Sequence, residues 1–371
     1  MLSLSDICPV LPDTRFDWEK TDSEFTCISQ LRGVPQDQEW HAEGDVWVHT
    51  RMVAEALAGL AEWQEMPREV RENIFLSALF HDVGKYFCTT TDNGRIIAPH
   101  HARRGEFIVR ELLYKGLPLH LPFHRRETVC KLVRLHGVPL WSLNEASLIR
   151  ASMTTNLKHL ALLAGADVLG RVCPDQKQLL EKVSFFRLFA QEQNCYESPY
   201  PFASPHSKFV WFHRKGNAPA YEPFDDTWGE VILMSGLPGA GKDTWIQNHG
   251  NGLPVVSLDD IRVKMKIKPT ETQGAVVQAG KEMARQWLRK KQPFIWNATN
   301  ITSHTRSGLI SLFTDYKARV KIVYAEAGYS QLMHRNSQRE AALPPEVIEK
   351  MISKLEIPAP EEAHEVVYSL L

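Results

Sequence analysis

Residues 231–244, VILMSGLPGAGKDT, decide the fold of the C-terminal part of this chain. The four apolar residues 231–234 are typical of a buried parallel strand. They lead into the spacing G-x-x-x-x-G-K, in which glycines let the backbone turn tightly and direct its N–H groups inward. The helix expected from Gly241 onward would present its N-terminus to an anion. The stretch therefore predicts a phosphate-binding loop that takes a nucleoside triphosphate, ATP or GTP, together with Mg²⁺.

Position 243 of this loop carries Asp where such loops have Ser or Thr. A carboxylate beside phosphates is repulsive unless a cation lies between them, so we interpret Asp243 as a Mg²⁺ ligand, direct or through water. The alternative is that Asp243 only favours the first helical turn. The residues expected to hold the nucleotide are Gly236, Gly239, Ala240, Gly241, Lys242, Asp243 and Thr244.

Histidine and aspartate recur on successive apolar, helix-like segments of the N-terminal half. His49 lies in the amphipathic stretch 45–63, and His81-Asp82 follows the apolar run 73–80. His101 begins a helix expected to reach about residue 114, and His136 follows the apolar run 128–135. Asp167 lies inside a hydrophobic helix, where a lone carboxylate has no obvious reason to be.

This order resembles the HD phosphohydrolase superfamily. The resemblance implies one metal held by His49, His81, Asp82 and Asp167, and a second held by His101 and His136 and bridged by Asp82. Nitrogen and oxygen ligands of this kind suit one or two divalent transition metals, such as Mn²⁺, Co²⁺ or Ni²⁺. His100 is an alternative to His101, but His101 has the H-x-x-x-G spacing to Gly105. Lys85 and Arg171 are candidate phosphate contacts, unless they are solvated helix residues.

The composition of the chain limits the number of domains and the classes of protein to which it can belong. The chain has 371 residues, a net charge of −1 and six dispersed Cys. We therefore expect two domains, no bulk electrostatic binding of nucleic acid, and free thiols in a reducing cytoplasm. The chain contains no run of about 18 apolar residues, which argues against a membrane span. The pattern favours an all-α domain over 1–195, a proline-rich linker or arm over 196–229 and an α/β domain with a parallel sheet over 230–371.

The strands expected in the last domain are 231–234, 255–258, 294–297, 320–324 and 366–370. Within the arm, KFVWFHRK (208–215) mixes aromatic and basic residues, as single-stranded nucleic acid platforms do. A linker strand that packs its aromatic side chains on a domain explains this segment as well.

Two further segments concern the acceptor of the phosphoryl group. In VVSLDDIR, Asp259 follows the second strand, so it could accept a hydroxyl proton while Arg262 holds a phosphate of the acceptor. Asp260 is a rival base, and helix capping is the alternative for Asp259. In MHRNSQRE, Arg335 and Arg339 lie four residues apart on one helix face, as in a lid over a triphosphate. In addition, IWNATN (295–300) ends the third strand with the polar residues Asn297, Thr299 and Asn300, which also narrow the acceptor; a turn is the alternative account.

These segments together resemble the 5′-OH polynucleotide kinases over residues 230–371, although Asp243 and Asn297 depart from the commonest loop pattern. With the HD module in front, the whole chain resembles the bacterial HD–polynucleotide kinase family of end-healing enzymes. The resemblance implies removal of 2′,3′-cyclic or terminal phosphate from RNA or DNA ends, phosphorylation of 5′-OH ends, and a functional link to a polynucleotide ligase. The alternatives are an HD nucleotidase fused to a small-molecule kinase, and a non-catalytic nucleotide-switched regulator.

Overall fold

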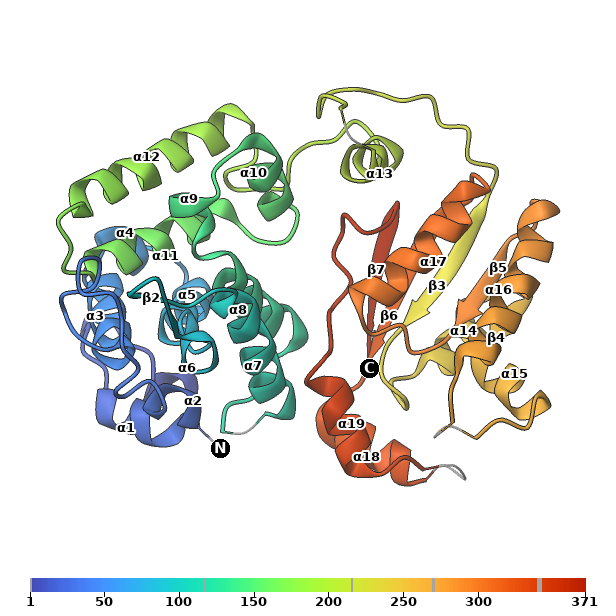
Figure 1. Ribbon diagram of the computed structural model, residues 1–371, viewed down its shortest axis with the longest axis horizontal. Helices are drawn as coiled ribbons and strands as arrows, with labels where there is room; N and C mark the ends of the chain where they lie inside the picture. The colour runs from blue at the N-terminus through green and yellow to red at the C-terminus, as the bar shows by residue number, and fades with distance from the viewer. Residues whose placement is uncertain (1, 117, 215, 269–270, 339–341) are drawn as a thin grey trace. The chain divides into compact units, whose positions relative to one another are not determined.

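The computed structural model describes residues 2–116, 118–214, 216–268, 271–338 and 342–371. It divides into two compact units, Met1–Pro201 and Phe202–Leu371, the first helical and the second α/β (Figure 1). The segment 196–229, expected as an arm, contains helix α13 (Pro205–His213), and the boundary between the units falls inside it.

The first unit is a bundle of helices around one apolar core. Its elements up to residue 88 are η1 (Leu4–Asp6), α1 (Trp18–Glu24), α2 (Thr26–Ser29), α3 (Val46–Gly59), α4 (Ala61–Gln64), α5 (Arg68–Phe80) and α6 (Lys85–Cys88). Those that follow are α7 (His101–Lys115), α8 (Phe123–Leu135), α9 (Val138–Trp141), α10 (Glu145–Ser152), α11 (Leu157–Leu169) and α12 (Gln176–Glu192).

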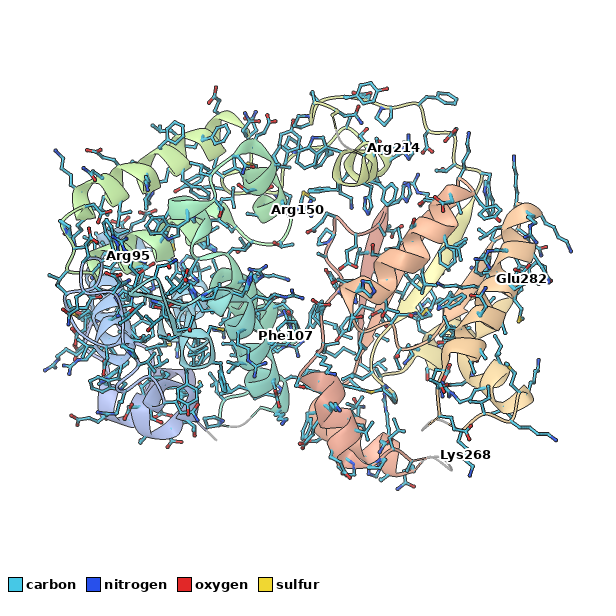
Figure 2. All side chains as sticks on the ribbon, viewed as in Figure 1. Arg95, Phe107, Arg150, Arg214, Lys268 and Glu282 are labelled. Carbon is cyan, nitrogen blue, oxygen red and sulfur yellow. The ribbon has the colours of Figure 1, made fainter. Side chains whose placement is uncertain are left out.

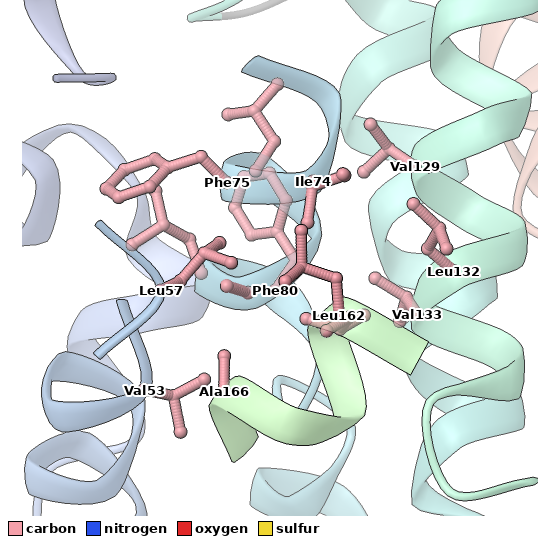
Figure 3. Packing of buried hydrophobic residues seen from close by; sticks show 14 of the residues in the cluster. Val53, Leu57, Ile74, Phe75, Phe80, Val129, Leu132, Val133, Leu162 and Ala166 are labelled. Carbon is pink, nitrogen blue, oxygen red and sulfur yellow. The ribbon is translucent and has the colours of Figure 1, made fainter. Parts of the chain in front are cut away.

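Four of these helices supply the centre of the core. Val53 from α3, Phe75 from α5, Val133 from α8 and Leu162 from α11 meet there, each fully or almost fully buried (Figure 3). Helix α5 is buried on all sides over residues 72–80, as expected for a central helix. The core therefore fixes the C-terminal ends of α5, α8 and α11, where four of the candidate metal ligands lie: His81, Asp82, His136 and Asp167.

A short antiparallel hairpin interrupts the helical unit. β1 (Thr90–Asp92) pairs with β2 (Arg95–Ile97) through a turn in which Asn93 and Gly94 have φ of +48° and +78°. The expectation of an all-α domain is corrected to this extent. The signal was in the sequence, because Asn-Gly between β-branched residues favours the left-handed conformations of a two-residue hairpin turn.

The second unit contains a five-stranded parallel sheet in the order β4-β5-β3-β6-β7. The strands are β3 (Glu230–Ser235), β4 (Val255–Ser257), β5 (Phe294–Asn297), β6 (Arg319–Glu326) and β7 (Glu365–Leu370), which confirms the five expected strands within a few residues. The helices are α14 (Lys242–His249), α15 (Leu258–Lys264), α16 (Gly274–Arg289), α17 (Ser303–Asp315), α18 (Tyr329–Ser337) and α19 (Pro345–Ile352).

Both faces of the central strand β3 are buried, as its continuous apolar run predicts. Val231 and Leu233 pack in one cluster with α16 and α17, whereas Ile232 and Met234 pack in another with Trp245 and Ile246 of α14. Exposed polar side chains such as Glu282 cover the outer side of α16 (Figure 2). The helical unit followed by a parallel α/β unit confirms the expected fold class.

Helix α13 replaces the strand considered for the arm. Phe209 belongs to the core of the second unit and stacks on His364, with ring centroids 4.1 Å apart. Two interpretations of segment 208–215 were open, a nucleic acid platform and a strand that packs on a domain. Phe209 does pack on a domain, but it does so from a helix and not from a strand. All six Cys are free, and none of the helices in the described ranges is long and apolar enough to cross a membrane.

Candidate metal centre and phosphate-binding loop

Three histidines of the first unit are held in the same way. The Nδ1 atoms of His81, His101 and His136 lie 2.7 Å, 2.7 Å and 2.8 Å from the carbonyl oxygens of the residues three positions earlier. Each ring thus donates its Nδ1–H to the backbone, and this bond fixes the tautomer and leaves Nε2 for another partner. His81 and His136 directly follow α5 and α8, and His101 begins α7.

The Nε2 atoms converge around Asp82. One carboxylate oxygen, Oδ2, lies 3.2 Å from Nε2 of His81 and 3.8 Å from Nε2 of His49. The other, Oδ1, lies 3.3 Å and 3.9 Å from Nε2 of His101 and His136. On the far side of His49, Asp167 Oδ1 is 3.1 Å from Nε2. The structure therefore brings together all six predicted metal ligands of this unit, with Asp82 between the two groups.

The electrostatics of this cluster fit a bound cation. Burial lowers the pKa of His101, and that of His136 to about 3, so both rings are neutral near pH 7. Because each donates its Nδ1–H to the backbone, two Nε2 lone pairs face each other at 3.3 Å. Asp82 Oδ1 is buried and has no hydrogen-bonding partner among the described residues. A divalent ion between these atoms would satisfy all three, so the donor set fits the metals that the family implies.

Asp82 remains ionised despite its burial. Burial alone would raise its pKa, but the attraction of His81 and Lys85 lowers the pKa well below its usual value. Lys85 Nζ lies 2.8 Å from Asp82 Oδ2 and donates to Gln36 Oε1 at 2.8 Å. The candidate phosphate contact Lys85 is thus placed beside the cluster, and in the absence of substrate it neutralises Asp82.

The turn after His81-Asp82 requires glycine. A Cβ on Gly84 would lie 2.0 Å from the carbonyl oxygen of His101 and 2.8 Å from the amide nitrogen of Gly105. The missing side chains at Gly84 and Gly105 let α7 approach the turn, which gives a physical reason for the H-x-x-x-G spacing. Of the two candidates, His101 faces the cluster, whereas His100 is exposed and has a left-handed backbone conformation.

Arg171, considered above as a phosphate contact, is bonded to Asp167 instead. Its guanidinium donates to both carboxylate oxygens of Asp167, from Nε at 3.0 Å and from Nη2 at 2.7 Å. This two-pronged ion pair accounts for the buried carboxylate on α11 and fixes its orientation. Arg171 is therefore better described as the residue that positions Asp167 than as a free phosphate contact.

The sequence analysis missed Glu43 and His41, which lie outside any recognisable pattern. Glu43 Oε1 is 2.9 Å from Nδ1 of His49 and 2.8 Å from Nδ1 of His41, and Oε2 accepts from the backbone N–H of Val172 at 2.9 Å. Glu43 thus places a carboxylate oxygen against Nδ1 of His49, the ring atom that in the other three histidines contacts a backbone carbonyl. A carboxylate behind a ligating imidazole fixes its tautomer and raises its basicity.

Glu43→Gln should weaken metal binding without unfolding the unit. The amide keeps the size of the side chain but removes the negative charge behind His49, and loss of such a partner costs on the order of 10- to 100-fold in metal affinity. The measurement is titration of the metal-free protein with Co²⁺ or Mn²⁺, with Glu55→Gln on the exposed side of α3 as the matched control. An affinity equal to that of the control variant would contradict the role of Glu43.

A cavity of about 600 Å³ opens beside the cluster. Asp82, His101 and His136 form part of its wall, together with Lys85 and Arg171. This volume is in the range of sites for small molecules such as nucleotides. The cluster is therefore accessible to a substrate through this cavity.

The predicted phosphate-binding loop has the expected geometry. Gly236, Gly239 and Gly241 have φ of +143°, +81° and +98°, and a Cβ on Gly236 would lie 2.4 Å from the carbonyl oxygen of Ala325. Lys242 Nζ donates to the carbonyl oxygens of Gly236 and Leu237 at 2.9 Å each, so it spans the loop. Ala240 is buried beneath the loop, and Thr244 is exposed on α14.

The two departures from the usual loop pattern contact each other. Asn297 Nδ2 donates to Asp243 Oδ1 at 2.7 Å, so the end of β5 meets the start of α14. Oδ1 of Asn297 is buried and has no hydrogen-bonding partner among the described residues. Two oxygen atoms, one from each side chain, are thus available to a hard cation such as Mg²⁺ or to its water. Asn297, for which the sequence left a functional role and a plain turn open, is therefore a candidate site residue.

Asp259 lies in the first turn of α15, directly after β4. It is not the capping residue, because the hydroxyl of Ser257 accepts from the backbone N–H of Asp260 at 3.1 Å. Arg262 Nη1 lies 2.5 Å from Asp259 Oδ1, and its Nε donates to Gln273 Oε1 at 2.8 Å. The predicted base and the predicted acceptor contact are therefore paired with each other in the absence of substrate.

Arg335 lies beside the phosphate-binding loop. Helix α18 places its Nη1 3.4 Å from the carbonyl oxygen of Gly239, with Leu332 of the same helix close to that glycine. A cation at this position can reach phosphates held by the loop. Arg339, the second predicted arginine of this helix face, lies outside the described residues.

Comparison with known proteins gives partial matches to each unit. A family model described as HD domain matches residues 46–164, and one described as AAA domain matches residues 231–358. An L-seryl-tRNA(Sec) kinase of Methanococcus maripaludis is 22% identical over 140 residues, 36% of this chain and 55% of that kinase. The chain thus spans about half the length of this curated relative.

Solved structures resemble part of the chain at low identity. A Chloroflexus aurantiacus protein described as a candidate kinase has 17% identity and a TM-score of 0.34, and the match covers 39% of this chain and 86% of that one. Kti12 of Chaetomium thermophilum, solved with ADP-AlF3, has 16% identity and a TM-score of 0.30, with coverage of 38% and 88%. By its two family matches, the chain joins an HD domain to a P-loop kinase-like domain.

Proposed function

We propose that the protein repairs both ends of a broken RNA or DNA strand. The HD unit would hydrolyse a 2′,3′-cyclic or terminal phosphate, and the P-loop unit would transfer the γ-phosphoryl group of an NTP to a 5′-hydroxyl. The observation that carries the proposal is the pairing, in one chain, of a bridged histidine–aspartate cluster with a phosphate-binding loop that is followed by Asp259 and Arg262.

In the HD unit, divalent ions would polarise the phosphoester and lower the pKa of a bound water. The role of the chain is to hold and orient. His49, His81 and Asp167 would face one ion and His101 and His136 the other, with Asp82 contributing one oxygen to each side. Lys85 lies in the cavity wall, where its ammonium group could leave Asp82 for a substrate phosphate.

In the P-loop unit, the loop amides, the N-terminus of α14 and Lys242 would hold the β- and γ-phosphates. Asp243 and Asn297 would hold Mg²⁺ or its water. Asp259 would take the proton of the attacking hydroxyl as the new P–O bond forms and the NDP leaves. Arg335, beside the loop, would stabilise the charge that spreads over the transferred group. The products would be ends suited to a polynucleotide ligase.

A second candidate acceptor is a hydroxyl group on a small molecule or on an aminoacyl-tRNA. The similarity to a kinase named for L-seryl-tRNA(Sec) favours this candidate. In that case the HD unit would act as a nucleotidase.

Acceptor preference separates the two candidates. The protein is incubated with labelled NTP and Mg²⁺ and offered a 5′-OH oligonucleotide, a nucleoside, an aminoglycoside and seryl-tRNA in parallel. Our proposal predicts transfer to the oligonucleotide with a kcat/KM well above the others. Transfer to the nucleoside, the aminoglycoside or seryl-tRNA in preference to the oligonucleotide would contradict it.

A further inference from the structure

Trp141 is the most exposed large aromatic side chain in the wall of the cavity beside the metal cluster. It ends helix α9, five residues after His136, and 59% of its surface is exposed. It lines the same cavity as Asp82, His101 and His136. An exposed tryptophan alone needs no explanation. Trp141, however, lines the cavity that leads to the candidate reaction centre, so a substrate bound there would lie within its reach.

Lys182 and Arg171, the latter already paired with Asp167, lie close to the Trp141 indole. Lys182 Nζ lies 4.8 Å from the ring centroid, and the guanidinium carbon of Arg171 lies 6.0 Å from it. Arg134, whose side chain is 42% exposed, lines the same cavity. An accessible aromatic face bordered by positive charge is the arrangement with which proteins hold single-stranded nucleic acid, since bases stack and phosphates pair with cations.

We propose that Trp141 stacks on the nucleobase of the nucleotide whose phosphate lies at the metal cluster. This inference rests on the proposed phosphoesterase function and deepens it, because it assigns a base-binding subsite to the HD unit. The cavity of about 600 Å³ has room for a nucleotide. Arg134 lines the same cavity and Lys182 lies over the Trp141 ring, and either would meet the next phosphodiester of a longer strand.

The subsite should appear as selectivity for substrates that carry a base. Stacking of one base on an aromatic side chain contributes enough binding energy for a change on the order of tenfold in affinity. Trp141→Ala should lower the ratio of kcat/KM for a nucleoside 2′,3′-cyclic phosphate to kcat/KM for methyl riboside 2′,3′-cyclic phosphate by about that factor. The loss should lie in KM, and Trp141→Phe should restore most of it, because phenylalanine keeps an aromatic face.

The test compares wild-type protein with Trp141→Ala, Trp141→Phe and the control Phe185→Ala, whose residue is equally exposed on α12 at 59% and does not line the cavity. Substrates are the two cyclic phosphates above and an oligonucleotide with a 2′,3′-cyclic end. A loss on both the mononucleotide and the oligonucleotide assigns the terminal base to Trp141. An unchanged ratio in Trp141→Ala, or a loss on the oligonucleotide alone, would overturn this assignment.

Binding of a nucleoside 3′-monophosphate, measured by calorimetry, is independent of hydrolysis. Wild-type protein that hydrolyses none of the substrates would refute the phosphoesterase proposal. Weaker binding of the nucleotide by Trp141→Ala than by Phe185→Ala would still support the base subsite. Equal binding by these two variants would overturn the base subsite by itself.

Discussion

Replacing Asp82 by alanine is expected to abolish phosphoester hydrolysis and to leave phosphoryl transfer at the parental rate. Asp82 is the side chain that faces both histidine groups, so its loss removes a ligand from each. Lys242→Ala should do the reverse, because Lys242 spans the phosphate-binding loop of the other unit. The measurement follows both activities of each variant with separately labelled 5′ and 3′ ends.

Matched controls are available in both units. Asp92→Ala removes an exposed aspartate from the β1–β2 hairpin, and Lys350→Ala removes an exposed lysine from α19. Both controls should keep both activities. The model of two independent sites would fail if Asp82→Ala or Lys242→Ala, still folded by circular dichroism and thermal melting, lost both activities at once.

Asp259→Asn is expected to lower the rate of phosphoryl transfer by about 10²-fold or more, while the affinity for NTP stays within a few-fold of the parent. The substitution keeps the size of the side chain and removes the carboxylate that would accept the hydroxyl proton. The donor phosphates should be unaffected, because the loop that would hold them precedes α14 and contains neither Asp259 nor Arg262.

Single-turnover transfer and equilibrium NTP binding should be measured on Asp259→Asn and Asp260→Asn in parallel. Asp260 is the right comparison, because only its backbone N–H is used by the Ser257 cap of α15, and its side chain is the neighbouring candidate base. Near-parental transfer by Asp259→Asn together with a large loss in Asp260→Asn would move the base to Asp260.

The elements that are marked by a strong local sequence pattern were predictable from the sequence. The five strands are marked by short apolar runs. The phosphate-binding loop is marked by glycines, which adopt positive φ in the structure. Both signals lie within a few residues of the element that they predict. The segment around Phe209 was harder to interpret. Its aromatic and basic residues suit a surface strand or a helix equally well. In the structure the segment is a helix, and its Phe209 stacks on His364, which lies far along the chain.

In the candidate site too, the sequence indicated the residues that follow a pattern and not those placed by tertiary contacts. His49, His81, Asp82, His101, His136 and Asp167 could be named because they form an ordered pattern along the chain. Glu43 could not, since its role depends on the proximity of its carboxylate to the ring of His49, which no sequence spacing indicates. Arg171 was noticed for its charge, but only the fold shows that this charge is directed at Asp167 rather than into solvent. Contacts that complete a site across loops are fixed by tertiary structure, which periodicity does not report.

The most direct test of the central claim is one reaction followed at both ends of one strand. An RNA oligonucleotide with a 5′-OH and a 2′,3′-cyclic phosphate is incubated with the protein, NTP, Mg²⁺ and Mn²⁺, and the products are resolved by mass spectrometry. We predict that a single strand gains a 5′-phosphate and has its cyclic phosphate opened or removed. A strand that remains unchanged at both ends, while the same preparation phosphorylates a small molecule, would contradict the proposal.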